Sequence, residues 1–326
     1  MQRGKLKAAL LFLPAAASFV LMLARNELTS AAAGEGLELC IRRVIPAMLP
    51  ALCLTHLLIG VFPSGMDGCV GKTFERLFHI RRDALPALLM GMVAGYPLGA
   101  EAAIQCCRLG KCSREEAGRL LVFANNCSPG FLFGIVGSVF PGEKRIPLML
   151  LFLQWTISLC LGVIFGKGHT PSVKSVIQSS GADAPLSSML TAAVKSGGRS
   201  ALMLCAFVIF FHVVSAFLPG SVLLRGSIEL TGGILALQRG PYASVCAAFL
   251  VGWGGLSVAF QVFSLLESSG ISGRAYIPCR LLHGALMAFC MFLYQLGEGY
   301  LLLFLSALLM VVIFVNIGGK TADSGI

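Results

Sequence analysis

The polar residues best suited to chemistry stand inside apolar sequence. Asn125 and Asn126 are adjacent, and with Ser128 they belong to an Asn-Asn-Cys-Ser-Pro-Gly run that interrupts a hydrophobic segment. Amide side chains donate and accept hydrogen bonds, and within a membrane they are costly unless they find partners. The run favours a binding site for a carboxylate or a heterocycle. The alternative is a kink in which these side chains satisfy freed backbone groups.

Two glycine-rich stretches are the second group of candidates, one ending at Gln105 and the other at Gln261. Interrupted backbone in a membrane exposes amides that can hold an anion, aided by the dipole of the helix that follows. Close helix packing by small residues is the alternative. Ser257 and Gln261 are four residues apart, so on a helix they share a face. The candidate binding residues of both stretches are Gly95, Tyr96, Pro97, Gly99, Gln105, Gly254, Gly255, Ser257 and Gln261.

Three charged residues complete the candidate site. Glu229, followed by Thr231, either lies in the membrane and couples proton movement or ends a helix as a loop residue. Arg119 and Arg280 take matching places in two similar stretches. A guanidinium there could bind a carboxylate through two hydrogen bonds. The alternative is that both arginines set topology at helix ends and reach toward the head groups.

No constellation typical of an enzyme accompanies these residues. The sequence lacks a P-loop, a His-Glu-x-x-His and a Gly-x-Ser-x-Gly motif, and its histidines are scattered. His56 and His212 fall in corresponding spans, where packing roles are the default expectation. The cysteines form no Cys-x-x-Cys pair, which favours buried reduced thiols. We therefore expect no enzyme, no catalytic residue, no metal and no cofactor.

Composition sets the class of protein. Of the 326 residues, 56% are hydrophobic and 12% are charged, whereas soluble domains have about 25% charged residues. A soluble enzyme, a disordered protein and a DNA-binding module are excluded, which leaves a multi-span helical membrane protein. The net charge of +10 comes from basic residues between apolar runs. There they set topology and contact lipid head groups, so nucleic acid is not an expected partner.

Nine apolar runs are candidate spans, because a membrane helix needs about 20 mostly apolar residues. They are residues 6–23, 44–62, 85–106, 120–140, 146–165, 201–218, 244–266, 277–296 and 300–315. The first follows three basic residues and resembles a secretory signal, yet it continues past Ala17 and favours an uncleaved span. The loops 63–84 and 166–199 are both basic and belong in the cytoplasm. That placement requires residues 85–106 to enter and return as a hairpin.

An internal repeat gives the architecture. The order of Gly95–Gly99, Gln105 and Arg119 recurs as Gly252–Ser257, Gln261 and Arg280, unless the similarity arises by chance. With a hairpin in each repeat the two repeats are inverted, as in secondary transporters with a site between them; with a full crossing they are parallel. We predict an all-α polytopic protein of about seven to nine membrane segments. Its parts are an N-terminal span and loop (1–43), repeat 1 (44–170), a cytoplasmic linker (171–198), repeat 2 (199–318) and a tail (319–326).

Four motifs resemble those of the YlbJ family, also called stage V sporulation protein V. This family belongs to the nucleoside-recognition or Gate-domain membrane proteins. The motifs are residues 92–100, residues 123–129, residues 229–233 and residues 252–261. The chain departs from the family pattern at Ala124, where a cysteine is usual, and at Cys127-Ser128-Pro129, where Ser-Gly-Pro is usual. It also departs at Ala259, where a histidine is common.

The resemblance implies a multi-pass protein of the bacterial inner membrane, in the outer forespore membrane of sporulating cells. It implies transport of a small organic anion, dipicolinic acid, toward the spore by alternating access. Membrane lipids, a second copy of the chain or other sporulation membrane proteins are the expected partners. A nucleoside or nucleobase transporter and a spore-envelope assembly protein without cargo are the alternatives.

Overall fold

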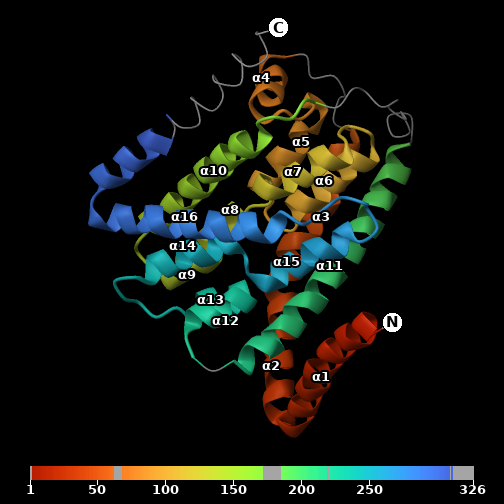
Figure 1. Cartoon of the computed structure of the whole chain (residues 1–326), viewed down its shortest axis with the longest axis vertical. Coiled ribbons are helices and arrows are strands. Elements are labelled where there is room, and N and C mark those ends of the chain that lie inside the picture. The colour runs from red at the N-terminus through yellow and green to blue at the C-terminus, as the bar shows by residue number, and fades with distance from the viewer. Residues whose placement is uncertain (1, 62–67, 172–184, 219, 309, 311–326) are drawn as a thin grey trace.

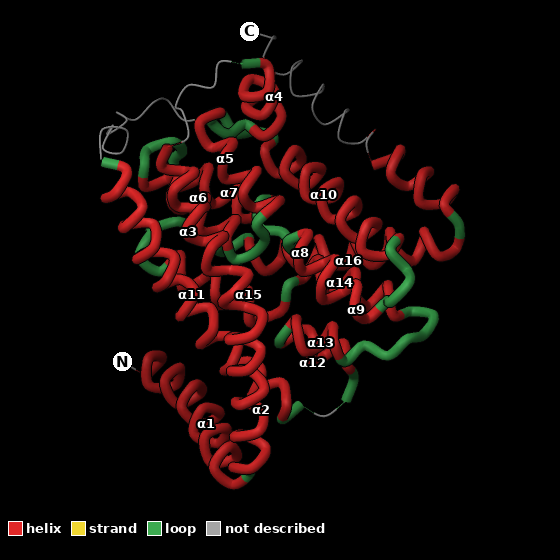
Figure 2. Tube along the Cα trace, turned by 180° about the vertical axis from the view of Figure 1, so that it is seen from behind, coloured by secondary structure: helices red, strands yellow, loops and turns green. Residues whose placement is uncertain are grey.

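The computed structural model describes residues 2–61, 68–171, 185–218, 220–308 and 310. Within these ranges all regular structure is helical, which confirms the predicted all-α polytopic membrane class (Figures 1 and 2). The tail at 319–326, half of the linker, part of the 63–84 loop and the end of the last apolar run lie outside the described residues.

The N-terminal helices project from the helical body (Figure 1). Helices α1 (Gln2–Ala24) and α2 (Asn26–Leu39) form a hairpin, and a π-helical turn, Cys40–Val44, joins α2 to α3 (Ile45–Val61). Helix α2 packs closely on α11 (Leu186–Ala216) because Gly36 has no side chain. A Cβ atom there would lie 3.1 Å from the Cα of Ile209.

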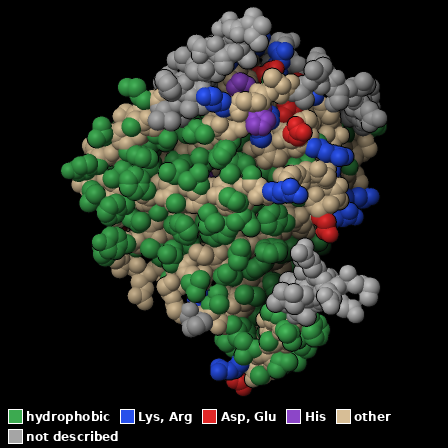
Figure 3. Space-filling model, in the orientation of Figure 1, with side chains coloured by type: hydrophobic (Ala, Val, Ile, Leu, Met, Phe, Trp, Pro, Cys, Tyr) green, Lys and Arg blue, Asp and Glu red, His purple; other side chains and the backbone are tan. Residues whose placement is uncertain are grey.

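Four helical segments of the described chain are long and apolar enough to cross a membrane. They are α10 (Arg145–Gly166), α11, the broken helix α14–α15 and α16 (Tyr276–Leu296). Shorter apolar helical stretches add Phe12–Ala24, Met48–Ile59, Pro129–Val139 and Glu298–Leu308. Hydrophobic side chains cover a broad area of the face in Figure 3, while charges gather near α4 and along one edge. Such an apolar surface suits contact with lipid.

The predicted return of residues 85–106 is present as a helical hairpin. Helices α5 (Leu85–Val93) and α6 (Leu98–Arg108) fold back on each other. The turn uses Gly95 at φ +90°, a conformation that favours glycine. The two helices approach closely because a Cβ atom at Gly99 would lie 2.9 Å from the Cα of Gly91. Small residues thus permit the hairpin.

A second helical hairpin was not anticipated from the sequence. Helices α12 (Val222–Ile228) and α13 (Leu230–Leu235) also fold back on each other, with Glu229 at the turn. Gly226 and Gly233 face each other so closely that a Cβ atom on Gly233 would overlap the Cα of Gly226. These helices are too short for the 3.6-residue pattern to reveal them in an apolar sequence.

Each hairpin is followed by a broken helix. Helix α7 (Arg114–Phe123) ends before a non-helical stretch at 124–128, and the chain resumes as α8 (Pro129–Phe131), a π-helical turn Leu132–Val136 and α9 (Gly137–Val139). Pro129 disfavours a helical Ser128, and the Ser128 hydroxyl accepts the N–H of Phe131. In the second half, α14 (Ala243–Trp253) ends at Gly254, φ +85°, before α15 (Gly255–Leu266).

The structural repeat has a different register from the sequence repeat. Residues 244–266 do not fold back: α14 packs along α16, whereas α15 turns toward α6, α11 and α12. The structure therefore pairs α5–α6 with α12–α13 and the α7–α8 break with the α14–α15 break. The sequence comparison had equated the tip of the first hairpin with the break of the second broken helix, because both are rich in glycine.

The described parts of the predicted basic loops, residues 68–84 and 166–171, meet at one end of the molecule, whereas residues 186–199, predicted as loop and linker, form the start of α11. Helix α4 (Cys69–Phe78) belongs to the first loop, and Gly166 at the end of α10 packs directly on it. A Cβ atom at Gly166 would lie 2.6 Å from the carbonyl oxygen of Phe78. This agrees with the placement of both loops on one side of the membrane.

Candidate substrate-binding site

The two hairpin tips and the two helix breaks converge inside the molecule. A Cβ atom at Gly95 would lie 2.7 Å from Cβ of Ser128, so the first tip rests on the first break. A Cβ atom at Gly255 would lie 3.3 Å from the carbonyl oxygen of Ile228, so the second tip rests on the second break. Tyr96 links the two halves, because its Cε1 lies 3.8 Å from the position that a Cβ atom on Gly254 would take.

Hydrogen bonds fix the path of the Asn125–Ser128 loop. The Asn126 amide donates to the carbonyl of Phe123 at 2.9 Å and accepts from the Ser158 hydroxyl at 2.6 Å. The Gln154 side chain accepts from the backbone N–H of Cys127 at 2.9 Å and donates to its carbonyl at 2.8 Å. Both amide atoms of Asn126 therefore have partners within the protein, which is the arrangement of the kink interpretation.

Asn125 is buried with one amide atom free. Its Nδ2 donates to the Tyr276 hydroxyl at 2.6 Å, and its Oδ1 has no hydrogen-bond partner. The Tyr96 hydroxyl is also buried, and its neighbour within the described chain is the Cys127 thiol, a weak hydrogen-bond partner. Buried polar atoms are nearly always hydrogen-bonded in folded proteins. An unpaired amide atom and a weakly paired hydroxyl at one place therefore indicate a position for a ligand or for ordered water.

Arg280 is the most unusual group at this centre. It is 0% exposed, and its Nη1 lies 2.9 Å from Nδ1 of His283. Its Nε and Nη2 have no hydrogen-bond partner, and within the described chain no carboxylate lies within 4.0 Å of it. It lies close enough to Tyr96, Cys127 and Tyr276 to act electrostatically on each. A permanent positive charge thus sits unpaired in the interior.

The free atoms of Arg280 define what it can bind. Nε and Nη2 form one edge of the guanidinium, and that edge matches the two oxygens of a carboxylate. An isolated buried charge costs several kcal/mol in a protein interior unless a partner compensates it. An anion between Arg280, Tyr96 and Asn125 would remove that penalty.

The other predicted site residues fall into different places. Gln105 donates to the carbonyl of His56 at 2.9 Å, and Arg119 donates to the carbonyl of His79 at 2.7 Å. The two arginines therefore do not form a common clamp. Ser257 and Gln261 share a face, 3.2 Å apart, and are buried.

Backbone positions account for the remaining candidates. Pro97 follows Tyr96 through a cis peptide bond and precedes α6, and Gly99 packs against Gly91. Glu229 caps α13 by accepting the backbone N–H groups of Thr231 and Gly232 at 2.9 and 2.6 Å. Thr231 thus takes part in this cap through its backbone N–H.

Two histidine–carboxylate pairs were missed by the sequence analysis. His56 Nε2 lies 3.1 Å from Oε1 of Glu101, and His212 Nδ1 lies 3.6 Å from Oε2 of Glu229. The other ring nitrogen of His212 lies 3.3 Å from Glu35 of α2. Core packing was the default expectation for both histidines. Their matching positions in the two halves were the available signal, but nothing in the sequence showed that Glu101 would face His56.

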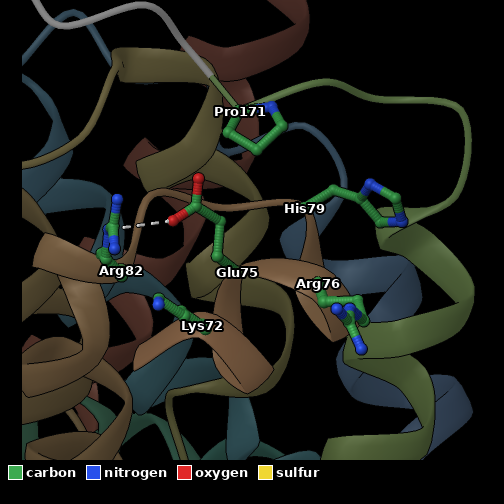
Figure 4. Close-up of a pocket in the computed structure, with 6 residues that line it drawn as sticks. All are labelled: Lys72, Glu75, Arg76, His79, Arg82 and Pro171. Carbon is green, nitrogen blue, oxygen red and sulfur yellow. Dashed lines mark ion pairs between the residues drawn. The ribbon is translucent and has the colours of Figure 1, made fainter. Parts of the chain in front are cut away.

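A separate hollow of about 400 Å³ opens at the end of the molecule beside α4. Figure 4 shows Glu75 turned toward Arg82, with their side chains 3.3 Å apart. Lys72 and Arg76 line the same hollow and are exposed. Burial, and then the charge of Arg119, lower the pKa of His79, so this ring is neutral at pH 7. The positive charge of the hollow therefore comes from lysine and arginine.

Comparison with known proteins gives a relative of similar sequence. The chain is 27% identical over 318 residues to the sporulation integral membrane protein YlbJ of Bacillus subtilis (strain 168), a match that covers 81% of this chain and 77% of the relative. The match agrees with the resemblance that the four motifs indicated. No family model matches the sequence, and no solved structure matches it.

Proposed function

We propose that this chain is a sporulation membrane transporter that binds a small organic dianion, dipicolinate, at Arg280. The cargo moves across the outer forespore membrane toward the spore. The observation that carries this proposal is the wholly buried Arg280 with a free Nε–Nη2 edge and no carboxylate partner in the described chain. The relative's name as a sporulation integral membrane protein supports the cellular setting.

Dipicolinate suits the groups around Arg280. One carboxylate takes the free guanidinium edge in a bidentate arrangement. The planar ring lies beside Tyr96, and the polar atoms of the ligand reach the Tyr96 hydroxyl and the unpaired Oδ1 of Asn125. These contacts come from both halves of the chain, because Tyr96 and Asn125 precede the linker and Arg280 follows it.

The hairpins and broken helices supply a transport mechanism. Two similar units, each a hairpin resting on a helix break, surround the site. We take the units to be inverted repeats that expose the site alternately to the two sides by rocking against each other. Non-helical backbone at the breaks is tolerated within a membrane where it lines a cavity or is covered by protein.

The test is binding and uptake of dipicolinate by purified protein in proteoliposomes. Arg280→Lys keeps the charge but removes the Nε–Nη2 edge of the guanidinium. We therefore expect dipicolinate binding to weaken about 10- to 100-fold, the cost of a charge-assisted hydrogen bond. Arg119→Lys is the matched control and should leave binding unchanged. Saturable nucleoside uptake that dipicolinate does not inhibit would show that the cargo is a nucleoside and not dipicolinate. Absence of any uptake, with normal dipicolinate in spores of a deletion strain, would favour envelope assembly.

A further inference from the structure

The two halves of the molecule carry the same buried arrangement of a histidine and a carboxylate. In the first half, His56 of α3 pairs with Glu101 of α6, one turn beyond the tip of the first hairpin. In the second half, His212 of α11 pairs with Glu229 at the tip of the second hairpin. Each pair thus joins the long first helix of its half to the hairpin of the same half.

Both carboxylates are withdrawn from solvent and lack a cationic partner other than histidine. Glu101 is 6% exposed and Glu229 is 3% exposed. Apart from the imidazoles, Glu101 accepts from the Ser200 hydroxyl at 3.3 Å, and Glu229 accepts the two backbone N–H groups that begin α13. No lysine or arginine of the described chain lies within 4.0 Å of either one.

The charge balance of each pair therefore depends on a proton. Hydrogen bonds stabilise each carboxylate, but its negative charge is neutralised within the pair only when the pair holds one proton, on the imidazole or on the carboxylate itself. The groups facing His212 are Glu229 and, from α2, Glu35. The charged group facing His56 is Glu101. Lys111, which follows α6, reaches α3 one turn beyond His56, where its Nζ donates to the carbonyl of Ile59 at 2.9 Å.

We propose that the His56–Glu101 and His212–Glu229 pairs are proton-binding sites that couple anion movement to protons. This inference rests on the proposed transport function and adds its driving ion. A protonated pair holds its hairpin against the first helix of the half. Loss of the proton leaves a buried negative charge, which weakens that contact and shifts the position of the hairpin. A dianion that travels with one proton on each pair moves no net charge.

The experiment compares two modes of dipicolinate movement in proteoliposomes. One is net uptake driven by a pH gradient, and the other is exchange of internal for external dipicolinate at equal pH. Exchange needs no net proton movement, so it reports on anion binding and on the conformational change alone. In the wild-type protein we expect the gradient to raise accumulation at least tenfold, with no response to membrane potential.

The variants are His212→Gln and His56→Gln, each made alone so that one remains if the other fails to fold. We expect each to lose at least 90% of gradient-driven accumulation while exchange remains measurable. His169→Gln, at an exposed loop position, is the matched control and should behave as the wild type. Gradient-driven uptake retained in both variants would overturn the proton sites.

Two further outcomes separate this inference from the function on which it rests. Exchange that occurs in the wild-type protein without any response to the pH gradient overturns the proton sites and leaves the transporter intact. Absence of exchange in the wild-type protein overturns dipicolinate transport, and the proposed proton coupling is then also wrong.

Discussion

The hydroxyl of Tyr276 accepts a 2.6 Å hydrogen bond from Nδ2 of Asn125. The bond crosses from the loop of the first broken helix to α16, and Tyr276 lies one helical turn before Arg280. Since residues four apart on a helix share a face, the bond holds the Asn125 amide on the side of α16 that carries the guanidinium. Two residues separated by 151 positions in the chain are thereby fixed around one buried charge.

Asn126 is expected to be essential through the fold of the loop. Asn126→Ala leaves the Phe123 carbonyl and the Ser158 hydroxyl without their partner. Each unsatisfied buried group costs about 1–3 kcal/mol, so we expect a loss of about 2–5 kcal/mol of stability and no transport. Thermal unfolding in detergent and uptake measure the two effects. Ser158→Ala, which removes one of the two bonds, should have a smaller effect; normal uptake by Asn126→Ala would contradict the assignment.

Tyr96 is expected to act on the ligand and not on the fold. The neighbour of its buried hydroxyl is the Cys127 thiol, a weak hydrogen-bond partner. Tyr96→Phe therefore removes only this weak contact and should leave the melting temperature within about 2 °C of the wild-type value. Dipicolinate binding should weaken about 3- to 10-fold, the value of one neutral hydrogen bond. Titration calorimetry checks the affinity. A clear loss of thermal stability with unchanged affinity would show that the hydroxyl serves packing.

The first hairpin is expected to depend on Gly91. A Cβ atom there would overlap the carbonyl oxygen of Ala124 and lie 3.1 Å from the Cα of Gly99. Gly91→Ala should therefore cost about 3 kcal/mol, the upper end of usual overpacking penalties, and abolish uptake. Gly34→Ala is the control because nothing lies within 4 Å of its added carbon, and it should be neutral or slightly stabilising in its helix. Comparable melting temperatures for the two variants would argue against the tight hairpin.

The ends of the two basic loops are expected to face the same compartment. Cys69 is exposed at the start of α4, and Thr170 is exposed beyond α10. In a variant whose other cysteines are replaced, Cys69 and the Thr170→Cys site should react with a membrane-impermeant maleimide from one side only, and from the same side. Labelling from opposite sides would show that residues 85–106 cross the membrane.

The helical class, the positions of the helix breaks and the resemblance to YlbJ could be read from the sequence, because each depends on local properties. Runs of apolar residues predict α10, α16 and the second half of α11. Pro129 and the glycines at 95 and 254 interrupt helices through the conformations that they favour or forbid. The Asn pair marked the first break for the same local reason, since its polarity stands out from the apolar sequence around it.

Only the tertiary structure decided which of these breaks are hairpins and which polar groups meet. The α12–α13 hairpin depends on the close approach of Gly226 to Gly233. Helices α14 and α15 do not fold back on each other, because α14 packs on α16 and α15 packs on α6. The same holds for the pairing of His56 with Glu101 and for the isolation of Arg280 from every carboxylate of the described chain. Packing between distant segments sets these distances. The sequence by itself therefore determined where the backbone breaks and which residues are polar, and the fold decided that one arginine at the centre would lack a partner.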